Sequence, residues 1–96
     1  MITIKKGGGM REEEVGYVEH WFGHLNVAGI KITNGALKVG DKIHIKGHTS
    51  DFTITVTSMQ VEHDNVQVAP QGSDIGITVP EHARIHDKVY KVLEEE

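Results

Sequence analysis

The chain has 96 residues, 38% of them hydrophobic and 25% charged, and a net charge of −4; this length suits one domain with a single core and excludes a second catalytic domain. There is no cysteine, which excludes disulfides, thiol nucleophiles and thiolate metal sites. The acidic balance argues against general affinity for phosphate backbones, and without a long apolar run or a signal-peptide core we expect a cytoplasmic protein with no membrane contact.

A short segment at each end of the chain is expected to lie outside the folded domain. Residues 1–13 are expected to form a flexible segment, in which "MITIKK" can make a short extra strand before three glycines. The domain then spans residues 14–93, and residues 94–96 form an acidic tail. Because six glutamates crowd the two ends, at positions 12–14 and 94–96, the middle is closer to neutral and can carry a local basic face.

Two strands are predicted in the first third of the domain. "EVGYVEHWF" (14–22) is rich in β-branched and aromatic residues, and "VAGIKIT" (27–33) follows the turn "GHLN". On a regular strand Trp21 and Phe22 point to opposite faces. Trp21 is then either exposed, where it can contact a protein partner or stack on a nucleobase, or buried as a cap on the open end of a barrel.

The segment "NGALKVGDKIHIKG" (34–47) combines turns with a half-buried strand. Gly35 and Gly40 suit turn positions that require positive φ, and Asp41 can accept backbone N–H bonds within the second turn. Ile43 and Ile45 are predicted to face the core, because inward positions recur every second residue.

The outer face of the same strand carries a predicted binding row, which comprises Lys42, His44, Lys46 and His48. These cationic or neutral donors can contact phosphates or acidic protein loops. The alternative is that lysines on an outer face only keep the domain soluble.

Further strands are predicted at residues 52–63, 74–79 and 87–93. The alternation in 52–63 slips near Ser58, which predicts a bulge. Gly76 is predicted to face a neighbouring segment or to mark a bend, and Asp87 belongs to a closing turn. Six or seven short strands with short links predict an all-β fold, a small closed antiparallel β-barrel that leaves no free edges.

Five motifs, in the right order, resemble the second domain of translational GTPases, the β-barrel of elongation factor Tu and initiation factor two. They are "VGYV", "GALKVGDKIHIKG", "VTSMQVEHDNVQVA", "QGSDIGITV" and "HDKVYKV", and the resemblance covers Val15 to Val92. The match is closest to small stand-alone members of this barrel family and to the barrel appended to some collagenase-like peptidases. It implies a contact with RNA or a ribosomal component.

The chain also departs from that family. His86 stands where the family usually has glycine before the closing Asp, so this turn must be built differently or must tolerate a side chain. "KGGGMR" is not a phosphate-binding loop, because it lacks the Lys-Ser/Thr that holds phosphate and magnesium, so we expect no nucleotide binding or GTP hydrolysis.

The histidines are the remaining candidates for chemistry. His20 and His24, like His82 and His86, have the spacing that lets two imidazoles share a metal on a helix, but neither pair lies convincingly on one. Neighbouring His–Asp pairs point to opposite faces of a strand, and Ser50 and Ser73 lack an identifiable base or oxyanion hole. We therefore expect no catalytic site and no cofactor.

The predicted function is a noncatalytic binding module that contacts RNA or the ribosome through the row from Lys42 to His48. One alternative is a protein-interaction or accessory domain that docks on a larger enzyme, with a contact centred on Trp21. A second alternative is a His-based metal binder.

Overall fold

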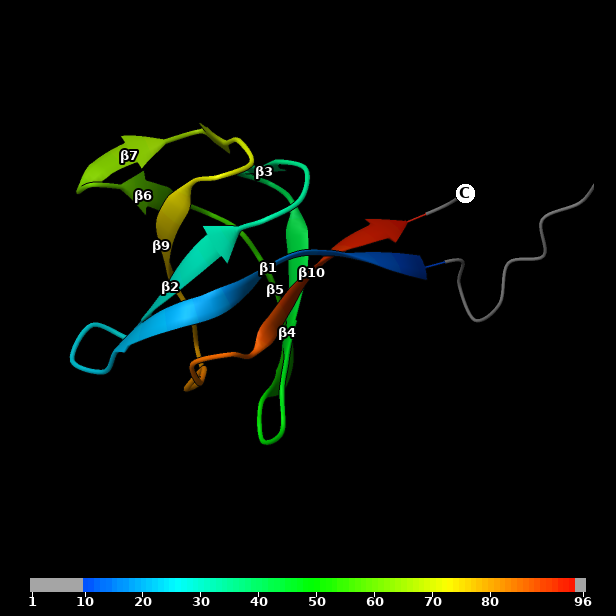
Figure 1. Ribbon diagram of the computed structural model, residues 1–96, viewed down its shortest axis with the longest axis horizontal. Coiled ribbons are helices and arrows are strands. Elements are labelled where there is room, and N and C mark those ends of the chain that lie inside the picture. Colours follow the sequence, from blue (N-terminus) through cyan, green and yellow to red (C-terminus); the bar gives the residue numbers. More distant parts are fainter. Residues whose placement is uncertain (1–9, 95–96) are drawn as a thin grey trace, which may run out of the picture.

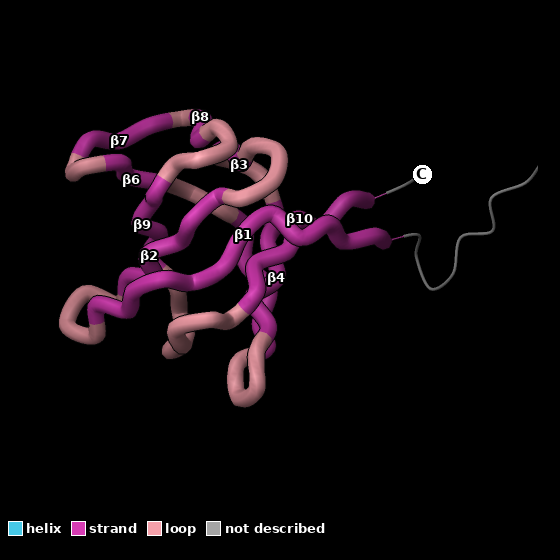
Figure 2. Tube along the Cα trace, viewed as in Figure 1, coloured by secondary structure: helices cyan, strands magenta, loops and turns pink. Residues whose placement is uncertain are grey.

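The computed structural model describes residues 10–94, which are all strands and loops without a helix (Figure 2). The strands are β1 Met10–Phe22, β2 Val27–Ile32, β3 Leu37–Lys38, β4 Lys42–Lys46, β5 Asp51–Thr55, β6 Met59–Val61, β7 Asp64–Val66, β8 Val68–Ala69, β9 Asp74–Thr78 and β10 Lys88–Glu94. The prediction of an all-β fold is confirmed. The strands outnumber the six or seven expected because the strand expected at 52–63 is divided into β5 and β6, and because β3, β7 and β8 are additional strands of only two or three residues.

Every strand pair is antiparallel, as predicted. One curled sheet has the order β5-β4-β10-β1-β2-β9-β6-β7, and β3 pairs with β8 in a separate two-stranded sheet (Figure 1). The large sheet ends at β5 and at β7, which do not pair with each other. The expected closure into a barrel is therefore not confirmed.

The strand β1 connects the two halves of the large sheet, with β10 on one side and β2 on the other. Its register shifts twice, between Glu14 and Gly16 against β10 and between Val18 and His20 against β2. A side chain at position 16 would overlap the carbonyl oxygen of Lys31 on β2, so glycine is required where the first shift occurs.

The first residues of β1, 10–14, pair with the end of β10, and these two strand ends extend together beyond the rest of the sheet (Figure 1). The strand thus begins before residue 14, where the domain was expected to start. The strand predicted in "MITIKK" and the end of the acidic tail lie outside the described residues. Within residues 10–94, no helix is long and apolar enough to cross a membrane.

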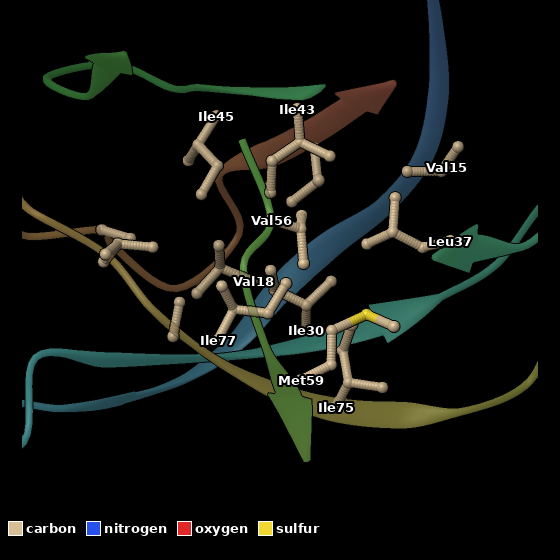
Figure 3. Packing of buried hydrophobic residues seen from close by; sticks show 14 of the residues in the cluster. Val15, Val18, Ile30, Leu37, Ile43, Ile45, Val56, Met59, Ile75 and Ile77 are labelled. Carbon is tan, nitrogen blue, oxygen red and sulfur yellow. The ribbon is translucent and has the colours of Figure 1, made fainter. Parts of the chain in front are cut away.

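The core consists mainly of aliphatic side chains from the inward positions of the strands. In Figure 3 the labelled side chains, among them Ile30, Ile43 and Met59, point toward one another between the strands. Ile43 and Ile45 are fully buried, as predicted. Burying one such side chain stabilises a fold by about 1.5–3 kcal/mol, so this cluster is the main source of stability.

The turn before β4 is built as the sequence predicts. Gly35 and Gly40 have φ angles of 74° and 100°, and the Lys38 backbone N–H donates to Asp41 Oδ2 at 2.9 Å. Partial burial opposes the charged form of Asp41, but the hydrogen bonds from Lys38 and the charge of Lys91 outweigh it and lower its pKa. Asp41 is therefore an ionised acceptor that holds this turn.

The turn before β10 is also confirmed, with a feature that the sequence did not reveal. Asp87 is buried, and its Oδ2 accepts a hydrogen bond from the Arg84 backbone N–H at 2.8 Å. Its other carboxylate oxygen lies against Gly47, where any Cβ would overlap it. His86 has a φ of 82°, so this turn tolerates a side chain at the unusual position noted above.

One other expectation was wrong in detail. The phase slip near Ser58 is not a bulge: β5 ends at Thr55, β6 begins at Met59, and the chain leaves the ladder between them. Of the two alternatives for Gly76, the structure shows the first, since this glycine marks no turn or bend and lies in the middle of β9, opposite Gly29 of β2.

Candidate functional site

The predicted cationic row lies on β4 and the turn that follows it: Lys42, His44, Lys46 and His48. His44 is held between two carboxylates, with its Nδ1 2.8 Å from Glu12 Oε2 and its Nε2 2.5 Å from Asp51 Oδ1. These carboxylates offset positive charge in the middle of the row. The geometry therefore offers a network between β1, β4 and β5 rather than an uninterrupted basic surface.

The ionisation of His44 follows from this position. Partial burial of the ring disfavours the imidazolium, but the hydrogen bonds and negative charges of Asp51 and Glu12 outweigh burial and raise the pKa of His44. The hydrogen bond from His44, the largest influence on Asp51, lowers the pKa of that carboxyl. Both ring nitrogens of His44 are thus bonded within the fold, one to Glu12 and one to Asp51.

Trp21 is half-buried, packs against the core, and stacks on the His82 ring with a centroid distance of 4.7 Å and an angle of 19°. Its neighbour Phe22 points outward and is 48% exposed. The two residues face opposite sides, as predicted. Trp21 was expected to be either an exposed contact residue or a cap over the core, and the geometry favours the cap. Phe22 is the more exposed aromatic side chain of the two.

A groove of about 370 Å³ lies beside Phe22 on the outer surface of β1, β2 and β9. It is bordered by the β1–β2 turn and by the β6–β7 turn, which lie at the same end of the molecule (Figure 1). The strands β2 and β6 pair with β9 on its two sides. Phe22 and Leu25, which is 67% exposed, form one wall. A second hollow of about 230 Å³ continues past Leu25 toward Thr78. The groove is therefore elongated and largely apolar.

Two glycines lie in the floor of the groove: Gly29 is buried beside the His20 and Phe22 side chains, and Gly76 is half-buried. Gly29 of β2 and Gly76 of β9 are direct partners across the sheet, and both line the groove. A side chain at Gly29 would press on the His20 Cβ at 3.1 Å, whereas one at Gly76 would meet only the Val27 side chain, at 3.3 Å. The sheet thus requires glycine less strictly at 76 than at 29.

The rim of the groove carries carboxyl groups from three elements: Glu19 of β1, Glu62 of the β6–β7 turn and Asp74 of β9. Burial, with the hydrogen bond and charge of Asp74, raises the pKa of Glu19. The hydrogen bond from Glu19, with the charge of Lys31, lowers the pKa of Asp74. Lys31 Nζ lies 3.3 Å from Asp74 Oδ1. Glu19 and Asp74 are therefore bonded to each other and to Lys31, and Glu62 is the rim carboxylate that offers an acceptor to a positively charged group.

The histidine pairs do not converge into a metal site in the structure. No group of three or more His, Asp or Glu side chains that could hold a metal ion occurs among residues 10–94. His82 is instead stacked on Trp21, and His20 contacts the Phe22 ring at a centroid distance of 5.9 Å.

The sequence predictions did not find the groove. Its floor and rim come from β1, β2, β9 and the β6–β7 turn, which are far apart in the chain. The available signals were the isolated glycines at 29 and 76, since glycine within a strand often marks the close approach of another group.

Curated proteases are similar to most of this chain. It is 34% identical over 85 residues to an uncharacterized protease of Methanocaldococcus jannaschii, which covers 88% of the chain and 21% of that protein. It is 35% identical over 92 residues to a collagenase of Porphyromonas gingivalis, covering 93% of the chain and 26% of the collagenase. The chain thus spans about a fifth to a quarter of the length of these relatives. No protein-family model matches it.

Two solved structures share the fold. Both are C-terminal domains of a Geobacillus thermoleovorans protein described as a U32 peptidase, one of them a selenomethionine variant. The variant has a TM-score of 0.75 and 15% identity, covering 80% of this chain and 96% of that domain. The other has a TM-score of 0.76 and 16% identity, covering 82% and 91%.

These comparisons correct the resemblance to the second domain of translation factors and the function drawn from it. The relatives are a protease and a collagenase, and the structural neighbours come from a peptidase. The motifs misled because their residues, such as Gly40, Asp41 and Ile43, build turns and core, which small all-β domains with different partners share. The comparisons favour the other branch of the resemblance, the barrel appended to collagenase-like peptidases.

Proposed function

We propose that this chain is a noncatalytic, protein-binding accessory domain of the kind that forms the C-terminal part of U32 peptidases. The observation that carries the proposal is the coverage of the match: nearly all of this chain is similar to about a fifth to a quarter of each protease. A segment with this relation is one module of a larger enzyme, and most of each protease lies outside it.

The side chains support a role without catalysis. Ser50 Oγ donates to the backbone carbonyl oxygen of His82 at 3.5 Å, which is not a base that could activate it. His44 is held by Glu12 and Asp51 on an outer face, with no candidate nucleophile among these partners. The chain contributes binding to proteolysis, and the bond-breaking groups belong to another part of the enzyme.

The groove beside Phe22 gives this role a surface. Exposed apolar patches with a polar rim are typical of protein-binding sites. Phe22 and Leu25 can bury apolar area against a partner, and aromatic side chains often dominate the energy of such contacts. The partner is either the protease domain itself or the polypeptide that the protease cleaves.

A domain exchange in the Porphyromonas gingivalis collagenase tests the proposal. The segment that matches this chain is deleted in one variant and replaced by this chain in another, and cleavage of denatured collagen is measured. Deletion should lower kcat/KM about tenfold or more, which corresponds to about 1.4 kcal/mol of lost binding, and the exchange should restore most of it. The isolated chain should cleave nothing.

Two results would contradict the proposed function. A folded chimera that is no more active than the deletion variant contradicts the accessory role. Cleavage of denatured collagen by the isolated, highly purified chain contradicts the absence of catalysis. A chimera with scrambled β6–β10 sequence is the control for the length of the inserted segment alone.

A further inference from the structure

Gly76 is the first observation that points to an occupant of the groove. Its φ is not among the positive values of the described chain, and a Cβ there would contact one movable side chain, that of Val27. Glycine within a strand costs about 0.5–1 kcal/mol relative to alanine. The backbone conformation does not account for this cost, and packing within the domain accounts for it only in part, because a small shift of the Val27 side chain would admit a Cβ. The absent side chain also leaves open the floor onto which another chain can settle.

The second observation is the apolar wall beside this floor. Phe22 and Leu25 are 48% and 67% exposed although both are large and hydrophobic. They lie in the same groove as the Gly29–Gly76 pair, and the hollow extends past Leu25 along β9. A volume of about 370 Å³ is at the lower end of the range of binding pockets. It accommodates one large side chain of a partner, or two small ones.

The third observation is strain in the β6–β7 turn at the rim. Glu62 and His63 have φ angles of 50° and 71°, and this conformation costs about 1–2 kcal/mol for each non-glycine residue. Asn-Gly is the favoured pair in such a turn. Asn and Gly would adopt this turn with less strain than Glu62 and His63 do. Both of these side chains line the groove. Strained residues cluster at functional sites.

We infer that the groove binds an extended polypeptide segment in which a large apolar side chain is next to Lys or Arg. The apolar side chain lies over Gly76 against Phe22. The cationic group lies at the carboxylate of Glu62, beside the Asp74 carboxylate that pairs with Lys31. The inference rests on the proposed function and deepens it, because it assigns the surface and the partner chemistry.

An NMR titration of the ¹⁵N-labelled full chain tests the inference. The probe is a short synthetic peptide that alternates Lys with Phe and Leu, and its counterpart has Glu in place of every Lys. We expect the basic peptide to shift the amide resonances of Gly29, Gly76 and Glu62. The acidic peptide should bind at least about tenfold more weakly, and added salt should weaken the binding of the basic peptide.

Three variants and one control locate the site. Gly76→Val fills the floor and should lower affinity about tenfold. Phe22→Ala removes the wall without touching the core, and it should have a similar effect even if Gly76→Val disturbs the sheet. Glu62→Gln should lower affinity for the basic peptide about threefold. Glu81→Gln changes an exposed carboxylate outside the groove and should have no effect.

Several results would overturn the inference while leaving the domain exchange to judge the proposed function. These are the absence of shifts with the basic peptide, shifts confined to another face, and equal affinity for the two peptides. Unchanged binding in folded Gly76→Val and Phe22→Ala variants has the same meaning. A single-stranded RNA that shifts these resonances when the basic peptide does not would identify a different class of partner.

Discussion

His44 lies on the outer face of β4 with a carboxylate on each side of its ring, from Glu12 and Asp51. Because the pKa of His44 is raised in the folded chain, its contribution to stability is fully present below the unfolded pKa of about 6.5. It is lost as the pH rises through the folded pKa. The wild-type protein should therefore lose up to about 1 kcal/mol of stability across this window, as exposed ion pairs contribute.

Urea unfolding at a series of pH values from about 6 to 9 checks this expectation. The His44→Gln variant should lack the loss, and the difference between the two proteins cancels the titration of the other histidines. His48→Gln is the matched control, since His48 is exposed in the turn after β4. Parallel curves for wild type and His44→Gln would show that the carboxylates do not stabilise the imidazolium.

Individual residues of the turns and core were predictable because their roles depend on local sequence. Gly40 and Asp41 form a turn through positive φ and a backbone hydrogen bond, and Ile43 is inward by simple alternation. The role of Gly47 was not predictable. It depends on the Asp87 carboxylate, which reaches it from the other end of the chain.

At the scale of elements, bulges limit what alternation can predict. The register shift between Val18 and His20 exchanges the faces of β1, so that Trp21 turns to the core and Phe22 to the groove. Without the shift the outward residue would be Trp21. The sequence therefore predicted that one aromatic is exposed, but only the pairing of β1 with β2 decides which.

The β6–β7 hairpin carries a prediction that separates stability from binding. The double variant Glu62→Asn with His63→Gly installs the favoured type I′ pair. It should stabilise the protein by about 1 kcal/mol, because the relief of left-handed strain exceeds the added freedom of glycine in the unfolded chain. It should also lower the affinity for the basic peptide about threefold or more, since the rim loses the Glu62 carboxylate.

Urea unfolding and the NMR titration measure the two effects on the same samples. Glu62→Gln is the control: it removes the charge but not the strain, so it should weaken binding without a gain in stability. If the double variant is more stable and binds the peptide as well as the wild type, then the Glu62 and His63 side chains are not kept for binding.

In the whole molecule, the groove exists because the sheet order places β2 beside β9 and β9 beside β6. Gly29 meets Gly76, and Gly76 meets Gln60, through pairings between strands that are well separated in sequence. Each glycine alone indicates little. The fold class was predictable from period-two patterns and turns, but the register that assembles the site is a property of the folded sheet.

The two sides of the groove should differ in local stability. On one side, β1 and β2 are interior strands that contribute Val18 and Ile30 to the centre of the core. On the other side, β7 is the end of the sheet, and the β6–β7 hairpin joins β9 through the single pairing of Gln60 with Gly76. Local opening costs least where few interactions hold an element. The hairpin should therefore open more often than the β1–β2 side.

Hydrogen exchange with and without the basic peptide checks this prediction. In the free protein, the amides of Val18 and Ile30 should exchange only through global unfolding, and those of Gln60 and Val61 through local opening at lower free energy. The peptide bridges both sides of the groove, so it should slow exchange in the hairpin much more than in β1 or β2. Equal protection across the sheet in the free protein, or peptide protection confined to β4, would contradict a groove formed between a rigid and a mobile wall.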